Sequence, residues 1–139
     1  MAEKLIIRGD SYTNLRPLYT YTLVNDLGQP YNLTGCTVRT TYKQTTSDPN
    51  DDTNDLNAAI KHDLIIDDSG DVLVSNGLTL VDGVEGGVIR ETLTRNETLA
   101  LPLGVSLKSD LELTTPEEVV TFISDDTLKA IDAYTNRVD

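Results

Sequence analysis

Turn signals recur along this chain about every 8 to 12 residues, and this spacing limits its fold more than any other feature. The chain is rich in threonine, valine and tyrosine, whose side chains favour strands over helices. The turn signals are Gly9-Asp10, Asn25 to Pro30, Asp67 to Asp71, Asn76-Gly77, Asp82-Gly83, Gly86-Gly87 and Pro116 to Glu118. The spacing predicts an all-β fold, a sandwich or a barrel.

Alternation of apolar and polar residues locates the strands within this frame. The clearest case is Val105–Leu113, in which Val105, Leu107, Ser109, Leu111 and Leu113 share one face. We expect strands over residues 4–8, 17–24, 36–43, 58–66, 72–74, 88–93, 105–113, 118–123 and 127–134, with a break at Asp125-Asp126 and a short helix as the alternative for the last segment.

Two further expectations concern side chains on the earlier strands. Tyr19, Tyr21 and Leu23 should lie on one side of their strand, with Leu18 on the opposite side. Cys36 should share the buried face of the next strand with Val38, Thr40 and Tyr42.

One helical turn is expected over residues 94–101. Thr94 is a good N-cap, and Glu97 lies three residues later, as in a capping box. Pro102 and Gly104 then end the helix.

Length and charge bound the organisation and the partners. With 139 residues and 38% apolar content, the chain suffices for a single domain over 1–139, with an acidic loop at 45–55 that has no apolar side chain. Its formal net charge of −12 disfavours nucleic acid and anionic lipid as partners. No apolar run approaches the ~20 residues of a membrane helix, so we expect a soluble protein.

The chain offers few residues suited to catalytic chemistry. The chain has one cysteine, Cys36, which cannot close an internal disulfide. With only one histidine, His62, in addition to this cysteine, it cannot assemble a zinc site either. His62 beside Asp63 resembles half of a proton relay, but no serine lies in a nucleophile elbow. We expect no catalytic, cofactor-binding or metal-binding residues and no enzyme activity.

Other motifs each have a structural and a functional interpretation. Arg8-Gly9-Asp10 matches an adhesion tripeptide, yet it stands where a strand must turn. Asp48 to Asp55 lacks the glycine and glutamate of an EF-hand, which leaves a plain acidic loop or a different calcium site there or at Asp67 to Asp71. The Asn32 and Asn96 sequons mark a turn and a helix cap. Three tyrosines close in sequence indicate core plus rim more than a sugar-binding wall: Tyr12, Tyr19 and Tyr21.

Several of these segments together resemble the N-terminal immunoglobulin-like domain of phage tail and baseplate proteins, including the upper baseplate proteins of siphophages. The family's "R-G-D-T" and "D-G-x-P-x-D-L-T-G-A-T-V" are matched by Arg8 to Ser11 and by Asp26 to Val38. Its short helix with an "L-P-x-G" exit is matched by Asn96 to Gly104, and its "D-V-T-R" ending by Tyr134 to Arg137. The chain departs at Ser106 and Lys108, where aromatic residues are usual, and in the acidic insertion from Ser47 to Asp55.

This resemblance implies an immunoglobulin-like antiparallel β-sandwich that serves as a structural virion protein, a tail or baseplate adaptor or fibre anchor. Its partners would be other virion proteins and further copies of itself in a ring, after synthesis in the bacterial cytoplasm. A small sandwich has sheet edges that can accept a neighbour's strand. Two alternatives stay open, a capsid decoration protein of the head and a carbohydrate-binding module.

Overall fold

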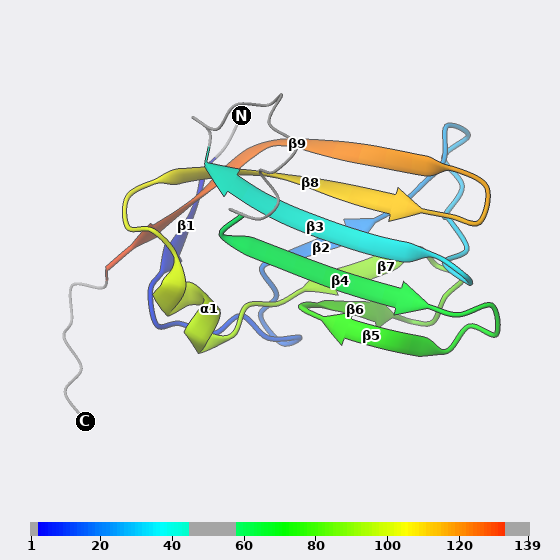
Figure 1. Cartoon of the computed structure of the whole chain (residues 1–139), viewed down its shortest axis with the longest axis horizontal. Coiled ribbons are helices and arrows are strands. Elements are labelled where there is room, and N and C mark those ends of the chain that lie inside the picture. The colour runs from blue at the N-terminus through cyan, green and yellow to red at the C-terminus, as the bar shows by residue number, and fades with distance from the viewer. Residues whose placement is uncertain (1–2, 45–57, 133–139) are drawn as a thin grey trace.

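The computed structural model describes residues 3–44 and 58–132 (Figure 1). Over these ranges the chain is almost entirely strand, so the all-β expectation is confirmed. The elements are β1 (Glu3–Ile7), β2 (Tyr19–Thr22), β3 (Thr37–Gln44), β4 (Ile60–Ile66), β5 (Val72–Asn76), β6 (Leu78–Val81), β7 (Val88–Glu91), α1 (Arg95–Ala100), β8 (Ser106–Thr114) and β9 (Val119–Ile131).

The strands form two sheets that pack as a sandwich. The larger sheet has the order β1-β9-β8-β3-β4-β5, and the smaller has the order β2-β7-β6. In Figure 1 the larger sheet lies in front of the smaller one, and α1 lies beside β1 at one end. The strand pairings are antiparallel except that of β1 with β9, which is parallel.

Alternation places the core as the sequence predicts. On β3 the side chains of Val38, Thr40 and Tyr42 are buried, and Cys36 just before them is also buried. On β8 the buried positions are Leu107, Leu111 and Leu113. These side chains line the inner face of the larger sheet, where each fully buried leucine contributes about 2 kcal/mol of transfer free energy.

The core divides into two apolar clusters. The helix-end core lies near β1 and α1, and the far-end core lies toward the opposite end of the sandwich. The helix-end core comprises Ile6, Tyr12, Leu18, Tyr42, Ile60, Leu93, Leu101, Leu107, Leu128 and Ala130. The far-end core comprises Leu23, Leu33, Cys36, Val38, Leu64, Ile66, Leu78, Ile89, Leu111 and Leu113.

The helix prediction is confirmed in detail. The Thr94 hydroxyl accepts a hydrogen bond from the Glu97 amide, and the Glu97 carboxylate accepts one from the Thr94 amide. The chain leaves α1 in extended conformation at Leu101 and reaches β9, where the Gly104 amide donates to the Ala130 carbonyl at 2.8 Å.

Three expectations about the strands are wrong. β6 is a strand that the sequence analysis did not predict, because its four residues show too little alternation to stand out from the turns around them. β9 continues through Asp125-Asp126, because the extra residues are absorbed by a shift of register against β8 between Lys108 and Asp110.

The third error concerns Leu18, which is 1% exposed although it was expected opposite Tyr19 and Tyr21. Its amide donates to the Glu91 carbonyl while Tyr19 is also paired with Glu91, so two residues of one strand oppose one residue of the other. Such a local bulge breaks the alternation and turns the Leu18 side chain inward.

The acidic loop at 45–55, with the candidate calcium residues Asp48 to Asp55, lies outside the described residues. The motif from Tyr134 to Arg137 does so too.

Candidate functional site

A cluster of polar side chains lies between the sheets, centred on Glu91 of β7. The Glu91 side chain is completely buried. Its carboxylate accepts hydrogen bonds from the hydroxyls of Tyr21, Thr40 and Tyr42, and one of its oxygens lies 2.6 Å from Nδ1 of His62. We call these five residues together with Glu97 the polar cluster; it draws on four strands and the helix.

His62 is the link between the sheets and α1. Its second ring nitrogen, Nε2, lies 2.7 Å from a carboxylate oxygen of Glu97. The ring also rests against Gly77, where a Cβ atom would come within 2.1 Å of the imidazole. Gly77 has a φ of +77°, so both the conformation and the space require glycine there.

Electrostatics favours a charged imidazole at this position. Burial opposes the cation, but the hydrogen bonds and charges of Glu91 and Glu97 outweigh it and raise the pKa of His62 to about 9. Burial, followed by the nearby charge of Glu91, raises the pKa of Tyr21 and Tyr42, so both phenols stay protonated and donate. His62 is therefore an imidazolium held between two carboxylates.

The geometry of the cluster fits a structural role better than a reactive one. The side chains of His62 and Glu91 have no exposed surface, so a substrate does not reach them. The two carboxylates contact opposite ring nitrogens and do not converge on one point. Across residues 3–44 and 58–132, no group of three or more histidine, cysteine, aspartate or glutamate side chains is arranged to hold a metal ion. The cluster cross-links both sheets and α1.

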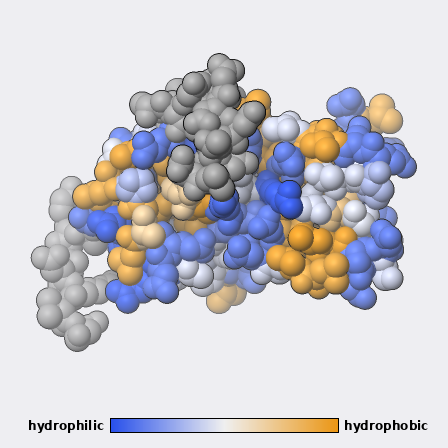
Figure 2. All heavy atoms as spheres, viewed as in Figure 1, coloured by the Kyte–Doolittle hydropathy of each residue, from blue (hydrophilic) through white to orange (hydrophobic). Residues whose placement is uncertain are grey.

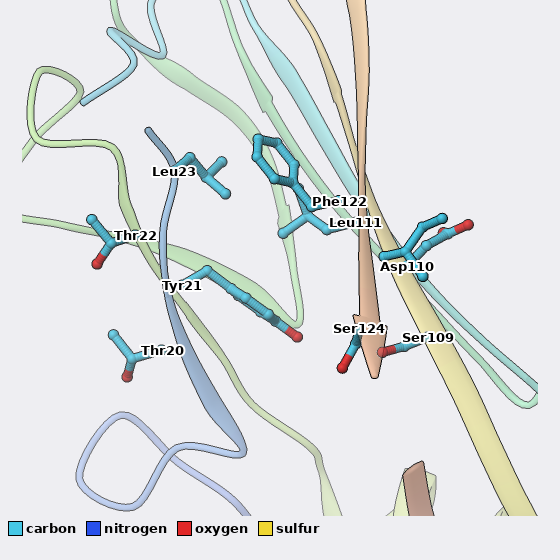
Figure 3. A pocket seen from close by; sticks show the side chains of 10 residues that line it. Thr20, Tyr21, Thr22, Leu23, Ser109, Asp110, Leu111, Phe122 and Ser124 are labelled. Carbon is cyan, nitrogen blue, oxygen red and sulfur yellow. The ribbon is translucent and has the colours of Figure 1, made fainter. Parts of the chain in front are cut away.

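The surface offers a different kind of site, an open groove between the sheets. It has a volume of about 310 Å³ and lies between β2 on one side and β8 with the first half of β9 on the other. Figure 3 shows the side chains of Tyr21, Leu23 and Phe122 pointing into it, whereas Thr20 and Thr22 point away. Ser109 and Ser124 add hydroxyls. An apolar floor with a few hydroxyls suits a peptide segment.

Two of the strands that border the groove, β2 and the first half of β9, are sheet edges. β2 is the outer strand of the smaller sheet. β1 pairs with β9 only over Thr127–Ile131, so the first half of β9, residues 119–124, has no strand beyond it in the described part of the chain. We call residues 119–124 the bare half of β9. Its outward-facing side chains include Val119, 61% exposed, and Ile123, 78% exposed.

The hydrogen-bonding direction along the bare half follows from its hairpin. The Thr115 amide donates to the Glu118 carbonyl at 2.8 Å, so these two residues form the hydrogen-bonded pair that closes the turn. Such pairs alternate along an antiparallel ladder. The backbone groups of Val119, Thr121 and Ile123 therefore point away from β8, toward the free edge.

A second edge lies on the opposite side of the larger sheet. β5 is its outermost strand, and Val72, Leu73 and Val74 are 45%, 64% and 39% exposed. Figure 2 shows the corresponding hydrophobic patch over β5. On this side the chain continues directly from β5 through Gly77 into β6 of the smaller sheet, so the sandwich is closed there.

Arg8-Gly9-Asp10 is confirmed as a structural turn. The Asp10 amide donates to the Ile7 carbonyl, and the Gly9 amide donates to the Thr98 hydroxyl. The Arg8 guanidinium donates to the Leu99 carbonyl and pairs with Asp132.

Cys36 is confirmed as a core residue, 1% exposed, and burial raises the pKa of its thiol. His62 does not pair with Asp63, which faces the other side of β4 and binds Arg39 at 3.0 Å. Asp67 holds its own turn, because its carboxylate accepts from the amides of Ser69 and Asp71.

The remaining motifs also have local structural roles. Asn32 closes a turn onto Thr34, and Asn96 lies in the first turn of α1. Tyr12 is buried while Tyr19 and Tyr21 are half-buried, as core plus rim predicts.

Glu91 is the important residue that sequence reasoning missed. It falls between Ile89 and Leu93 on the inward face of a strand, and a carboxylate in that pattern signals a buried acid with partners. The bare half of β9 gave no such signal, because only the tertiary structure shows that β1 stops short of it.

In the described ranges no helix is long and apolar enough to cross a membrane. Neither a protein-family model nor a curated protein nor a solved structure matches the chain.

Proposed function

We propose that this protein is a structural component of a phage virion, a tail or baseplate adaptor or fibre anchor that works by assembly with other virion proteins. The proposal includes a ring of identical copies and excludes catalysis, nucleic acid and membrane contact. Its starting point is the resemblance of the turn and strand motifs to the immunoglobulin-like domains of phage tail and baseplate proteins.

The observation that carries the proposal is the pair of sheet edges. Each edge carries exposed apolar side chains, Val72 to Val74 on β5 and Val119 with Ile123 on β9. Proteins usually protect such edges, because an unpaired strand with apolar side chains recruits other chains. Edges of this kind suit a protein whose role is to be held by its neighbours.

The strand order supports the immunoglobulin-like part of the proposal. Variable-type immunoglobulin sandwiches join strands A, B, E and D in one sheet and G, F, C, C′ and C″ in the other. Here β2, β7 and β6 form one sheet, and β9, β8, β3, β4 and β5 follow the second order, with β1 added beside β9.

The motifs of the resemblance also lie at turns and exits. Asp26 and Leu27 lie in a turn that the preceding residue, Asn25, stabilises by accepting from the amides of Leu27 and Gln29. Pro102 follows α1 where the chain leaves the helix.

Charge is consistent with assembly in a crowded cell. A net charge of −12 opposes random clumping of free copies and favours basic surfaces on a partner.

The test is to locate the protein in purified phage particles by mass spectrometry and by immuno-electron microscopy. We expect gold label on tails or baseplates. Label on heads would favour the decoration protein instead. Absence from particles, together with a monomer that binds no other virion protein, would contradict the proposal.

A further inference from the structure

We propose that the groove between β2 and the bare half of β9 binds an extended segment of a different protein, which adds as a strand to the edge of β9. The expected segment places apolar side chains at alternate positions into the groove and carries lysine or arginine at its ends. This inference rests on the proposed function and specifies one contact that assembly would use.

The edge provides a ladder of hydrogen-bonding groups. The backbone groups of Val119, Thr121 and Ile123 point outward, in the direction that a further strand would take. Six extended residues span about 20 Å, which is the length of an ordinary strand. Peptides that bind by strand addition use this combination of a free edge with side-chain pockets beside it.

The groove supplies the pocket. Tyr21 comes from β2 and Leu23 directly follows that strand, whereas Leu111 and Phe122 come from the larger sheet, so an inserted side chain would contact both sheets. A side chain two residues further along the incoming strand would meet the hydroxyls of Ser109 or Ser124. Alternation of apolar residues in the bound segment follows from this spacing.

β1 shows what kind of strand this edge accepts. It lies parallel to the second half of β9, along the same edge that is bare over the first half. Ile6 of β1 is fully buried, Lys4 lies 5.2 Å from the ring centre of Tyr19, and Arg8 pairs with Asp132. The chain's own strand thus has an apolar centre with a basic residue on either side.

Charge around the bare half favours the same chemistry. Glu117 and Glu118 precede β9, and no lysine or arginine is among the residues that line the groove. An acidic rim attracts basic ends and repels a second copy of a chain with a net charge of −12. We therefore assign the groove to a different, basic segment.

The first experiment selects random twelve-residue peptides, displayed on a carrier protein, against the full chain. We expect enrichment of peptides with alternating apolar residues and basic ends. Amide NMR shifts caused by the enriched peptide should fall on Thr20 to Leu23 and on Val119 to Ser124. Failure to enrich any peptide, enrichment of acidic peptides, or shifts centred on β5 would overturn the inference.

Two variants at one position separate backbone pairing from side-chain contact. Thr121→Pro removes an amide that points to solvent, at a place where a sheet edge tolerates proline. This substitution should weaken the affinity for the enriched peptide about tenfold, which is the effect of one lost hydrogen bond. Thr121→Ala keeps the amide and should change affinity less than about twofold. Equal weakening by both variants would refute strand addition, and the NMR shifts on the unaltered protein decide the matter if Thr121→Pro does not fold.

Two further results distinguish the explanations. Self-association of the peptide-free protein that Thr121→Pro abolishes would show that a second copy fills the groove, and the inference would be wrong. Peptide binding by a protein that is absent from phage particles would leave the groove inference intact and contradict the virion role. A protein that is found on tails but whose groove selects no peptide would support the virion role and contradict the groove inference.

Discussion

The two halves of β9 belong to one strand but differ in what lies beside them. Over Thr127–Ile131 the strand is flanked by β1, and Leu128 and Ala130 are 1% exposed. Over residues 119–124 it borders an open groove, and no described strand lies on the side away from β8. A sheet edge is protected in the first case and available in the second, within about 20 Å of each other.

The difference separates the half of β9 that contributes to folding stability from the half that is available for binding a partner. The covered half is joined to β1, to the segment after α1 and to the helix-end core. The bare half contributes Phe122 to the rim of the far-end core and leaves its outer side to a partner. Substitutions should therefore be costly for folding in one half and costly for binding in the other.

The largest effect should come from the polar cluster, which lies between the two sheets. Glu91→Ala leaves an imidazolium and three hydroxyls without their shared acceptor and should cost about 4 kcal/mol of unfolding free energy. Chemical denaturation measures the loss. Glu85→Ala, at an exposed position, is the control and should change stability by less than about 0.5 kcal/mol.

Alkaline pH should weaken the same cluster. The folded pKa of His62 is about 9 against 6.5 for a free histidine, so its contribution is complete below pH 6.5 and is lost as the pH rises through 9. The loss should reach about 3 kcal/mol or less.

Thermal unfolding between pH 6.5 and 9.5 checks this pH dependence. The His62→Gln variant should lose most of it. An unchanged slope in that variant would mean that other groups control alkaline stability.

Alanine substitutions compare the two halves directly. Leu128→Ala in the covered half removes a buried side chain and should cost about 3 kcal/mol. Ile123→Ala in the bare half removes an exposed one and should cost less than about 0.5 kcal/mol. Similar losses for both variants, measured by denaturation, would show that the bare half is packed against something.

Proline substitutions compare the backbone pairing of the two halves of β9. The Ile131 carbonyl accepts from the Arg8 amide, and alternate residues of a strand point the same way, so the Lys129 amide faces β1. Lys129→Pro should cost about 2 kcal/mol through the lost ladder bond, and Thr121→Pro less than about 1 kcal/mol. The order of the two unfolding midpoints is the readout, and the reverse order would contradict the comparison.

Sequence reasoning performed well where one face of a strand decides burial. The pattern from Val105 to Leu113 and the capping box of Thr94 were predicted correctly, because period and capping are local properties. It did worse at Asp125-Asp126, since two acids read as a turn while a register shift lets the strand continue. Glu91 and the bare half of β9 depend on which strands meet across the chain, which local patterns do not encode.

Amide hydrogen exchange on the isolated protein, followed residue by residue by NMR, tests the central claim most directly. We predict rapid exchange at Val119, Thr121 and Ile123 and slow exchange at Lys129 and Ile131, whose amides face β1. Equally slow exchange in both halves would mean that the edge is already paired in the free protein, and an edge that is already paired has no place for a partner.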